Sequence, residues 1–259
     1  MNRPFDLRKP PYRVARARLS NGLRLLTIQT PHLHTASVCL YVRAGSRYET
    51  PATNGLSHFL EHMLFRGSGR YPSSFALNLA IEELGGTLYA ETGRDYSLYQ
   101  IALHPKQVGR GLEILGDLFS TPAFRDIDLE RKIVVEEILE DLDDRGRNVN
   151  VDDQSRKLAW GAHPLGFPIT GPMRNVKRFS LGDVRGHFRR FYGAANMVLA
   201  VAGPLAHGAV GAQAREAFAR VHPVSRRRPI RAGCRFQDDR SRIGCSLALL
   251  GGGVPCIPR

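Results

Sequence analysis

The alternation of hydrophobic and polar positions predicts six strands. Residues 13–30 alternate on both sides of Asn21-Gly22, a dipeptide typical of a tight hairpin turn. Residues 36–44 are rich in apolar and β-branched side chains, as strands are. Three further segments are predicted as strands, the first two of them as a hairpin: 87–91, 95–103 and 197–202.

Apolar side chains at three- and four-residue spacing predict the helices. Asn54 is predicted as the N-cap of the first helix, and Gly85-Gly86 are predicted to end the second. The order of strands and helices predicts an α+β fold, in which a largely antiparallel or mixed sheet carries helices packed on one face. The predicted helices span residues 54–65, 74–84, 105–120, 127–143, 152–160, 181–192 and 206–219.

Composition and charge narrow the possible partners. The 259 residues are 42% hydrophobic, and the net charge is +13. The basic residues are spread along the chain and not gathered with aromatic residues, so we expect no nucleic-acid partner. The apolar stretches fall short of a membrane span, so we expect no membrane insertion. The basic start lacks the apolar region of a secretory signal; an Arg-rich transit peptide is the alternative to the cytoplasmic location that we expect.

Two histidines and a glutamate interrupt the apolar helix predicted over residues 54–65. His58 and His62 are four residues apart, so both imidazoles project from one face and can reach one divalent ion, for which zinc is the usual occupant. Glu61 directly precedes the second histidine and can act on a metal-bound water. This H-x-x-E-H order is a metallopeptidase signature. The alternative is a set of polar residues at the edge of a core helix.

A zinc site with two histidines needs a third protein ligand, and the acidic segment 127–143 offers several. Glu130, Glu137 and Asp141 fall on one stripe of a helix together with Val134, whereas Glu136 points about 100° away. Apolar residues at 133–135, 138 and 139 are expected to cover most of this helix. Embedded glutamates would then need a cation as partner. Glu140, Asp143 and Asp144 are expected to be solvated.

The segments HFLEH and ERKIVVEEI resemble the pitrilysin/insulinase family of zinc metallopeptidases, which includes the β-type subunits of mitochondrial processing peptidases. The resemblance implies one Zn²⁺ per chain, held by His58, His62 and Glu137. Glu137 lies 75 residues after His62 and seven after Glu130, as in that family. It also implies Glu61 as the catalytic base and Glu130 as a second, supporting acidic residue. LSNGLRLL, VRAGSRYE, HPLG and NMVLAVAG extend the resemblance from residue 14 to about residue 220.

The family's peptide-binding edge strand usually contains Asn-Ala-x-Thr. Ala90 and Thr92 match this motif and are the predicted substrate-binding residues, whereas Tyr89 stands where asparagine is expected. The resemblance implies that a peptide or unfolded polypeptide pairs with this strand through its backbone, and such pairing does not depend on the side chain at position 89.

The predicted organisation is a zinc metallopeptidase domain over residues 1–222, followed by a linker and the truncated start of a second homologous repeat over 223–259. Because family members close a second domain or partner chain over the first, we expect a homodimer, a heterodimer or a companion half-enzyme. Three hypotheses follow: a zinc metalloendopeptidase, a catalytically silent or partner-dependent subunit of the same fold, and a basic binding protein in which the motif is coincidental.

Overall fold

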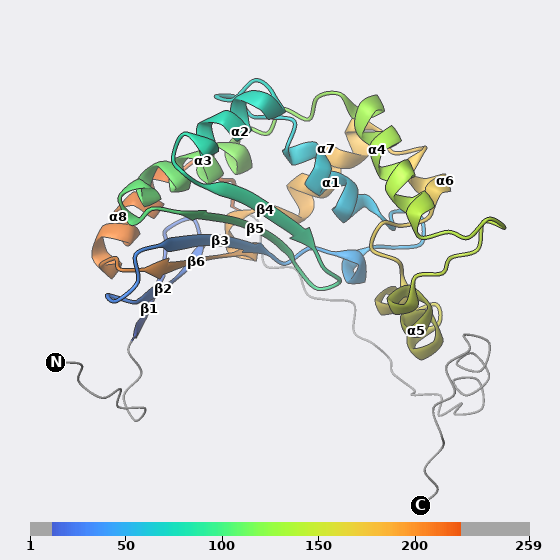
Figure 1. Cartoon of the computed structure of the whole chain (residues 1–259), viewed down its shortest axis with the longest axis horizontal. Helices are drawn as coiled ribbons and strands as arrows, with labels where there is room; N and C mark the ends of the chain where they lie inside the picture. The colour runs from blue at the N-terminus through green and yellow to red at the C-terminus, as the bar shows by residue number, and fades with distance from the viewer. Residues whose placement is uncertain (1–11, 224–259) are drawn as a thin grey trace, which may run out of the picture.

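The computed structural model describes residues 12–223 of the chain (Figure 1). Its strands form one six-stranded sheet in the order β1-β2-β6-β3-β5-β4. Neighbouring strands run antiparallel, except that β2 and β6 are parallel. The strands are β1 (Arg13–Arg18), β2 (Arg24–Gln29), β3 (Ala36–Val42), β4 (Thr87–Thr92), β5 (Ser97–Leu103) and β6 (Met197–Gly203).

Most of the helices arch over one face of this sheet, while α5 stands apart at one end (Figure 1). Alternate residues of β3 and β6 are buried beneath the helices, as a sheet covered on one face requires. The α-helices are α1 (Leu56–Leu64), α2 (Ser74–Glu82), α3 (Val108–Ser120), α4 (Ile127–Glu140), α5 (Val151–Trp160), α6 (Met173–Val176), α7 (Leu181–Phe191) and α8 (His207–Ala217). Short 3₁₀ turns occupy Ser46–Tyr48, Pro105–Gln107, Pro164–Gly166 and Ala194–Asn196.

The predicted α+β class, the six strands and the packing of helices on one face of the sheet are confirmed. The turn at Asn21-Gly22 joins β1 to β2 as expected, and Gly22 adopts the positive φ that this turn requires. The short helix α6 was not predicted, because four residues are too few to show a period. The first eleven residues and residues 224–259, which include the predicted start of a second repeat, lie outside the described part. No helix within residues 12–223 is long and apolar enough to cross a membrane.

Two local predictions are wrong. Asn54 does not cap α1: the N-cap is Gly55, and the Asn54 side chain instead donates hydrogen bonds to Glu49 and to the carbonyl of Pro168.

The apolar residues of α4 also do not all face the core. Ile133 and Leu139 are exposed, and Val134 and Ile138 are the buried apolar residues of this helix. The reason is that α4 packs on the rest of the domain along one narrow stripe.

A buried carboxylate holds the segment that follows α1. Asp117 of α3 accepts hydrogen bonds from the Ser68 hydroxyl at 2.5 Å, the Arg70 backbone N–H at 3.1 Å and the Thr121 hydroxyl at 3.2 Å. Burial alone would raise the pKa of Asp117, but these hydrogen bonds outweigh burial and lower it. Asp117 therefore anchors residues 68–70, which follow α1, to a different helix.

We predict that Asp117→Asn lowers the free energy of unfolding by about 1–3 kcal/mol at pH 7, because an amide group cannot accept all of these hydrogen bonds. The pKa of Asp117 is lower in the folded state, so its contribution is complete above the pKa of an unfolded aspartate, about 3.9. The contribution is lost as the pH falls through the folded pKa. Urea unfolding at pH 7 and below pH 4 measures both effects.

The matched control is Asp128→Asn. Asp128 is 86% exposed at its side chain and pairs with Arg131 on the surface of α4, so its loss should cost less than about 1 kcal/mol. Equal losses in the two variants would show that the Asp117 network does not stabilise the fold.

Candidate active site

Helix α1 carries the two histidines on a single face. Its apolar residues, Leu56, Phe59, Leu60, Met63 and Leu64, are buried and hold the helix in the core. The remaining face presents His58 and His62, whose ring centroids lie 4.7 Å apart. The four-residue spacing therefore does bring the two imidazoles together, as expected for a helix.

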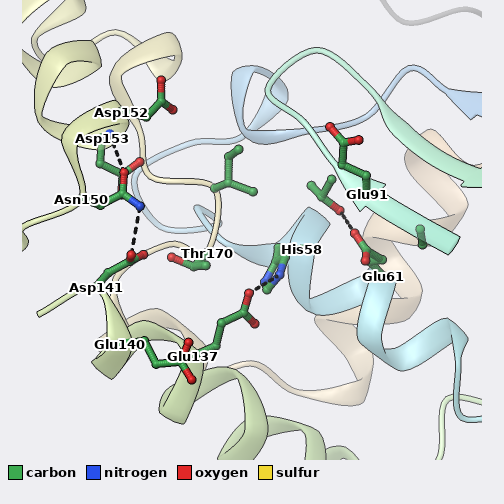
Figure 2. Close-up of a pocket in the computed structure, with 13 residues that line it drawn as sticks. His58, Glu61, Glu91, Glu137, Glu140, Asp141, Asn150, Asp152, Asp153 and Thr170 are labelled. Atoms are coloured by element: carbon green, nitrogen blue, oxygen red, sulfur yellow. Dashed lines mark hydrogen bonds and ion pairs between the residues drawn. The ribbon is translucent and has the colours of Figure 1, made fainter.

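Glu137 of α4 faces both imidazoles. Its Oε1 lies 3.3 Å from His58 Nε2 (Figure 2). Its Oε2 lies 3.4 Å from His62 Nε2. One ligand atom from each of the three residues lies within 4.8 Å of the others. In a tetrahedral zinc site with bonds of about 2.0–2.2 Å, neighbouring ligand atoms are about 3.3–3.6 Å apart. The donor set and its separations therefore fit a zinc ion.

Glu130 lies about two helical turns before Glu137 on α4 and contacts His62. The Glu130 side chain is buried, 6% exposed. Its Oε2 lies 3.1 Å from His62 Nδ1, and its Oε1 accepts a hydrogen bond from Arg66. When Nδ1 carries the proton and donates to Glu130, Nε2 has a free lone pair for a metal. Glu130 is thus placed to set the tautomer and the orientation of a ligand.

The electrostatics of this cluster favour added positive charge. Burial opposes a charged His62, but Glu130 and Glu137 outweigh it and raise the pKa of His62 to about 9. Hydrogen bonds from His58 and His62 hold the pKa of Glu137 well below its usual value. Two carboxylates that stabilise a charge between two imidazoles form an environment suited to a divalent cation.

Glu61 lies on the side of the cavity nearest the edge strand β4, across from Glu137 (Figure 2). It accepts a hydrogen bond from the Thr92 hydroxyl. Burial raises the pKa of Glu61, while the Thr92 hydrogen bond and the nearby histidines act in the opposite direction. A carboxylate whose pKa is raised by burial is suited to accept and return a proton.

His58, Glu61 and Glu137 line a cavity of about 490 Å³ between β4 and the segment that joins α4 to α5. Ala90, Glu91 and Thr92 line it from the strand, so both predicted substrate-binding residues border the cavity. Tyr89 does not line the cavity, and its side chain is 54% exposed. β4 is the last strand of the sheet, so one of its edges is unpaired within the described residues.

The opposite wall of the cavity is acidic and was not predicted as part of the site. Asp141, Asn150, Asp152 and Asp153 cluster on this wall (Figure 2). Glu140, expected to be simply solvated, also borders the cavity. The acidic residues concentrated at 140–144 and at 152–153 were the only feature of the sequence that could have indicated this wall. Their convergence depends on the loop that turns α5 back towards α4, which periodicity does not describe.

Thr92 has a contact that was not predicted from the sequence. Substrate binding by Thr92 stays a prediction, and its buried side chain also donates a hydrogen bond to Glu61. Alternation along β4 places Ala90 and Thr92 on one face, but only the packing of α1 beneath the strand determines what that face meets.

Comparison with known proteins places this site in a family. The model of the insulinase family, peptidase family M16, matches residues 24–173. A probable β subunit of the mitochondrial-processing peptidase of Arabidopsis thaliana is 35% identical over 205 residues, which cover 78% of this chain and 38% of that protein. An uncharacterized zinc protease of Streptomyces coelicolor is 31% identical over 237 residues, 86% of this chain and 51% of that protein. The chain thus spans about half or less of the length of these relatives.

Three further similarities concern one subunit of a complex and two solved structures of the same fold. Subunit 1 of the mitochondrial cytochrome b-c1 complex of Mus musculus is 36% identical over 191 residues, 73% of this chain and 39% of that protein. A protease from Helicobacter pylori superposes with a TM-score of 0.78 at 19% identity, covering 86% of this chain and 54% of that one. An inactive peptidase domain from Pseudomonas fluorescens superposes with a TM-score of 0.76 at 17% identity, covering 85% and 53%.

The structural similarities show the shared fold, and the family match covers both histidines, Glu61, Glu130 and Glu137. A coincidental motif in an unrelated basic protein is thereby excluded. The chain belongs to the insulinase family of peptidases.

Proposed function

We propose that this chain is a zinc-dependent metalloendopeptidase domain that hydrolyses peptide bonds of extended polypeptides. The observation that carries the proposal is the convergence of His58, His62 and Glu137 at separations suited to one zinc ion. Glu61 lines the same cavity as His58 and Glu137. The similarity to the zinc protease of Streptomyces coelicolor supports the same metal.

His58, His62 and Glu137 would hold one Zn²⁺ per chain. When bound, zinc polarises a carbonyl and lowers the pKa of a water molecule towards about 7. Glu61 accepts the proton of the attacking water and returns it to the leaving amine, a transfer typical of a positioned carboxylate. Thr92 restrains the Glu61 carboxylate through its hydrogen bond, and Glu130 holds the His62 ring.

The unpaired edge of β4 would bind the substrate backbone. A polypeptide that adds to this edge as a further strand runs past Ala90 and Thr92, which border the cavity that His58 and Glu61 also line. The proposed substrate is accordingly a peptide or an unfolded polypeptide.

A second candidate is a partner-dependent or catalytically silent subunit of the same fold. Two similarities favour it: one relative is a subunit of the cytochrome b-c1 complex, and one structural neighbour is an inactive peptidase domain. The proposed assembly is a homodimer, a heterodimer or a pair with a companion half that completes the enzyme, in keeping with the relative that is a subunit of a complex. The clustering of His58, His62 and Glu137 beside the Glu61 motif position favours the endopeptidase. Assay of the chain with and without a co-expressed companion separates the two candidates.

We predict that Glu61→Gln lowers kcat for a fluorogenic peptide by about 10²–10⁴-fold, because the amide cannot accept the proton. Zinc content, measured by atomic emission, should stay at one ion per chain, since Glu61 is not among the proposed ligands. Unchanged peptidase activity in this variant would refute Glu61 as the base.

We predict that Glu137→Ala abolishes stoichiometric zinc binding at micromolar zinc, because two imidazoles alone form an incomplete site. Glu136→Ala is the matched control: Glu136 is the adjacent residue on α4, is exposed and does not line the cavity. Isothermal titration with zinc measures both variants. If Glu136→Ala loses zinc and Glu137→Ala retains it, the ligand assignment is wrong.

We predict that single backbone N-methylation of a cleaved peptide inhibits hydrolysis at every second position near the scissile bond. In an added strand, alternate N–H groups face the partner strand, so only those positions lose a hydrogen bond. kcat/KM for a series of singly methylated peptides reveals the period. A uniform effect along the peptide would exclude strand addition at β4.

A further inference from the structure

We propose that Glu49, which lies outside the cavity, is a positioning residue that fixes His58 by holding the first turn of α1. This role rests on the proposed zinc function. Glu49 does not line the cavity and is not among the residues placed at the metal site.

Both oxygens of the Glu49 carboxylate bind the start of α1. Oε1 accepts the Ser57 backbone N–H at 2.6 Å, and Oε2 accepts the Gly55 backbone N–H at 2.9 Å and the Asn54 side-chain amide at 3.1 Å. The residue is buried, 1% exposed, so these contacts are shielded from water. Hydrogen bonds from N–H groups to a carboxylate are the stronger kind, and a negative charge at a helix N-terminus is stabilised by the helix dipole.

The geometry of Gly55 explains why α1 takes its cap from a distant residue. Gly55 occupies the N-cap position with φ of 97° and makes no side-chain cap hydrogen bond. A Cβ atom at this position would overlap the carbonyl of Thr170, which crosses directly over it. A serine, aspartate or asparagine therefore does not fit at the N-cap. The Leu56 N–H donates to the Thr53 carbonyl, and the Ser57 N–H depends on Glu49.

A second buried contact holds the same turn. The Ser57 hydroxyl lies 3.0 Å from Nε2 of His187 on α7, and both side chains are buried. Burial, with a smaller contribution from Arg190, lowers the pKa of His187 to about 3, so the ring is neutral at physiological pH and acts as a hydrogen-bond partner. Glu49 and His187 thus anchor the backbone and the side chain of the residue directly before His58.

The two histidines differ in what holds their rings. His62 Nδ1 is held by Glu130, which is in turn bound by Arg66. His58 Nδ1 is buried, and no group within residues 12–223 forms a hydrogen bond with it. Metal-binding histidines usually owe their orientation to a group on the second ring nitrogen. Because His58 has no such group, the position of its ring depends on the backbone that Glu49 holds.

The test compares Co²⁺ binding, followed by visible absorption, in the full wild-type chain and in Glu49→Gln. The amide keeps one acceptor but turns an NH₂ group towards backbone N–H donors, so the first turn of α1 loses part of its anchor. We expect Glu49→Gln to bind Co²⁺ at least tenfold more weakly, with an altered absorption spectrum, as for losses of groups that orient metal ligands. Hydrogen exchange should show faster exchange of the Ser57 amide in this variant.

Asp117→Asn is the matched control, because Asp117 is also a buried carboxylate that accepts a backbone N–H, and its hydrogen bonds go to residues outside α1. It should lose stability while binding Co²⁺ as the wild-type chain does. If Glu49→Gln loses stability but retains wild-type Co²⁺ affinity and spectrum, Glu49 is only a stabilising cap and the proposal is overturned.

A second variant and the wild-type measurement separate the remaining outcomes. If Glu49→Gln does not fold, Glu49→Asp, which keeps the charge but shortens its reach, is judged by the same affinity and spectrum. A wild-type chain that binds no Co²⁺ overturns the zinc site itself, and with it the role of Glu49. Wild-type binding together with unchanged binding in the Glu49 variants overturns the positioning role alone.

Discussion

The contact between α1 and α4 is the constraint on which the site depends. Each helix alone is an ordinary element: α1 is a core helix and α4 lies largely at the surface. Where they meet, Glu137 faces both histidines and Glu130 is buried against His62. Burial of Glu130 is tolerable because Arg66 and His62 both bind its carboxylate, since an unpaired buried charge would be strongly destabilising. The pairing of Glu130 with His62 thus makes the contact between α1 and α4 possible and also orients the His62 ring.

The charge distribution sets the cavity apart from the chain as a whole. The protein carries a net charge of +13, yet seven carboxylates border the cavity: Glu61, Glu91, Glu137, Glu140, Asp141, Asp152 and Asp153. A concave surface of one sign concentrates the local field, so the cavity is negative within a positive molecule. Arg94, on the turn between β4 and β5, pairs with Asp152 and Asp153 and ties the acidic wall to the strand side.

The sequence predicts contacts within elements better than contacts between them. The Asn21-Gly22 turn and the spacing of His58 and His62 follow from local geometry, and the structure agrees with both. Glu137 could be chosen among the acids of its helix only through the resemblance to a family, because periodicity left Glu130 and Asp141 equally eligible. The cap of α1 was misassigned to Asn54, since capping preferences take no account of a chain segment that crosses over Gly55. The link from Thr92 to Glu61 likewise depends on how a helix packs under a strand.

The unpaired edge of β4 has a consequence for the kinetics of the proposed reaction. The strand is six residues long, so a segment that pairs along all of it must be extended over about 20 Å and free of its own hydrogen bonds. A short peptide meets this condition at once. A folded protein meets it only when a stretch of that length opens, so its rate of cleavage follows the population of the opened state. Such an enzyme would distinguish its targets by their local stability before it reads any side chain.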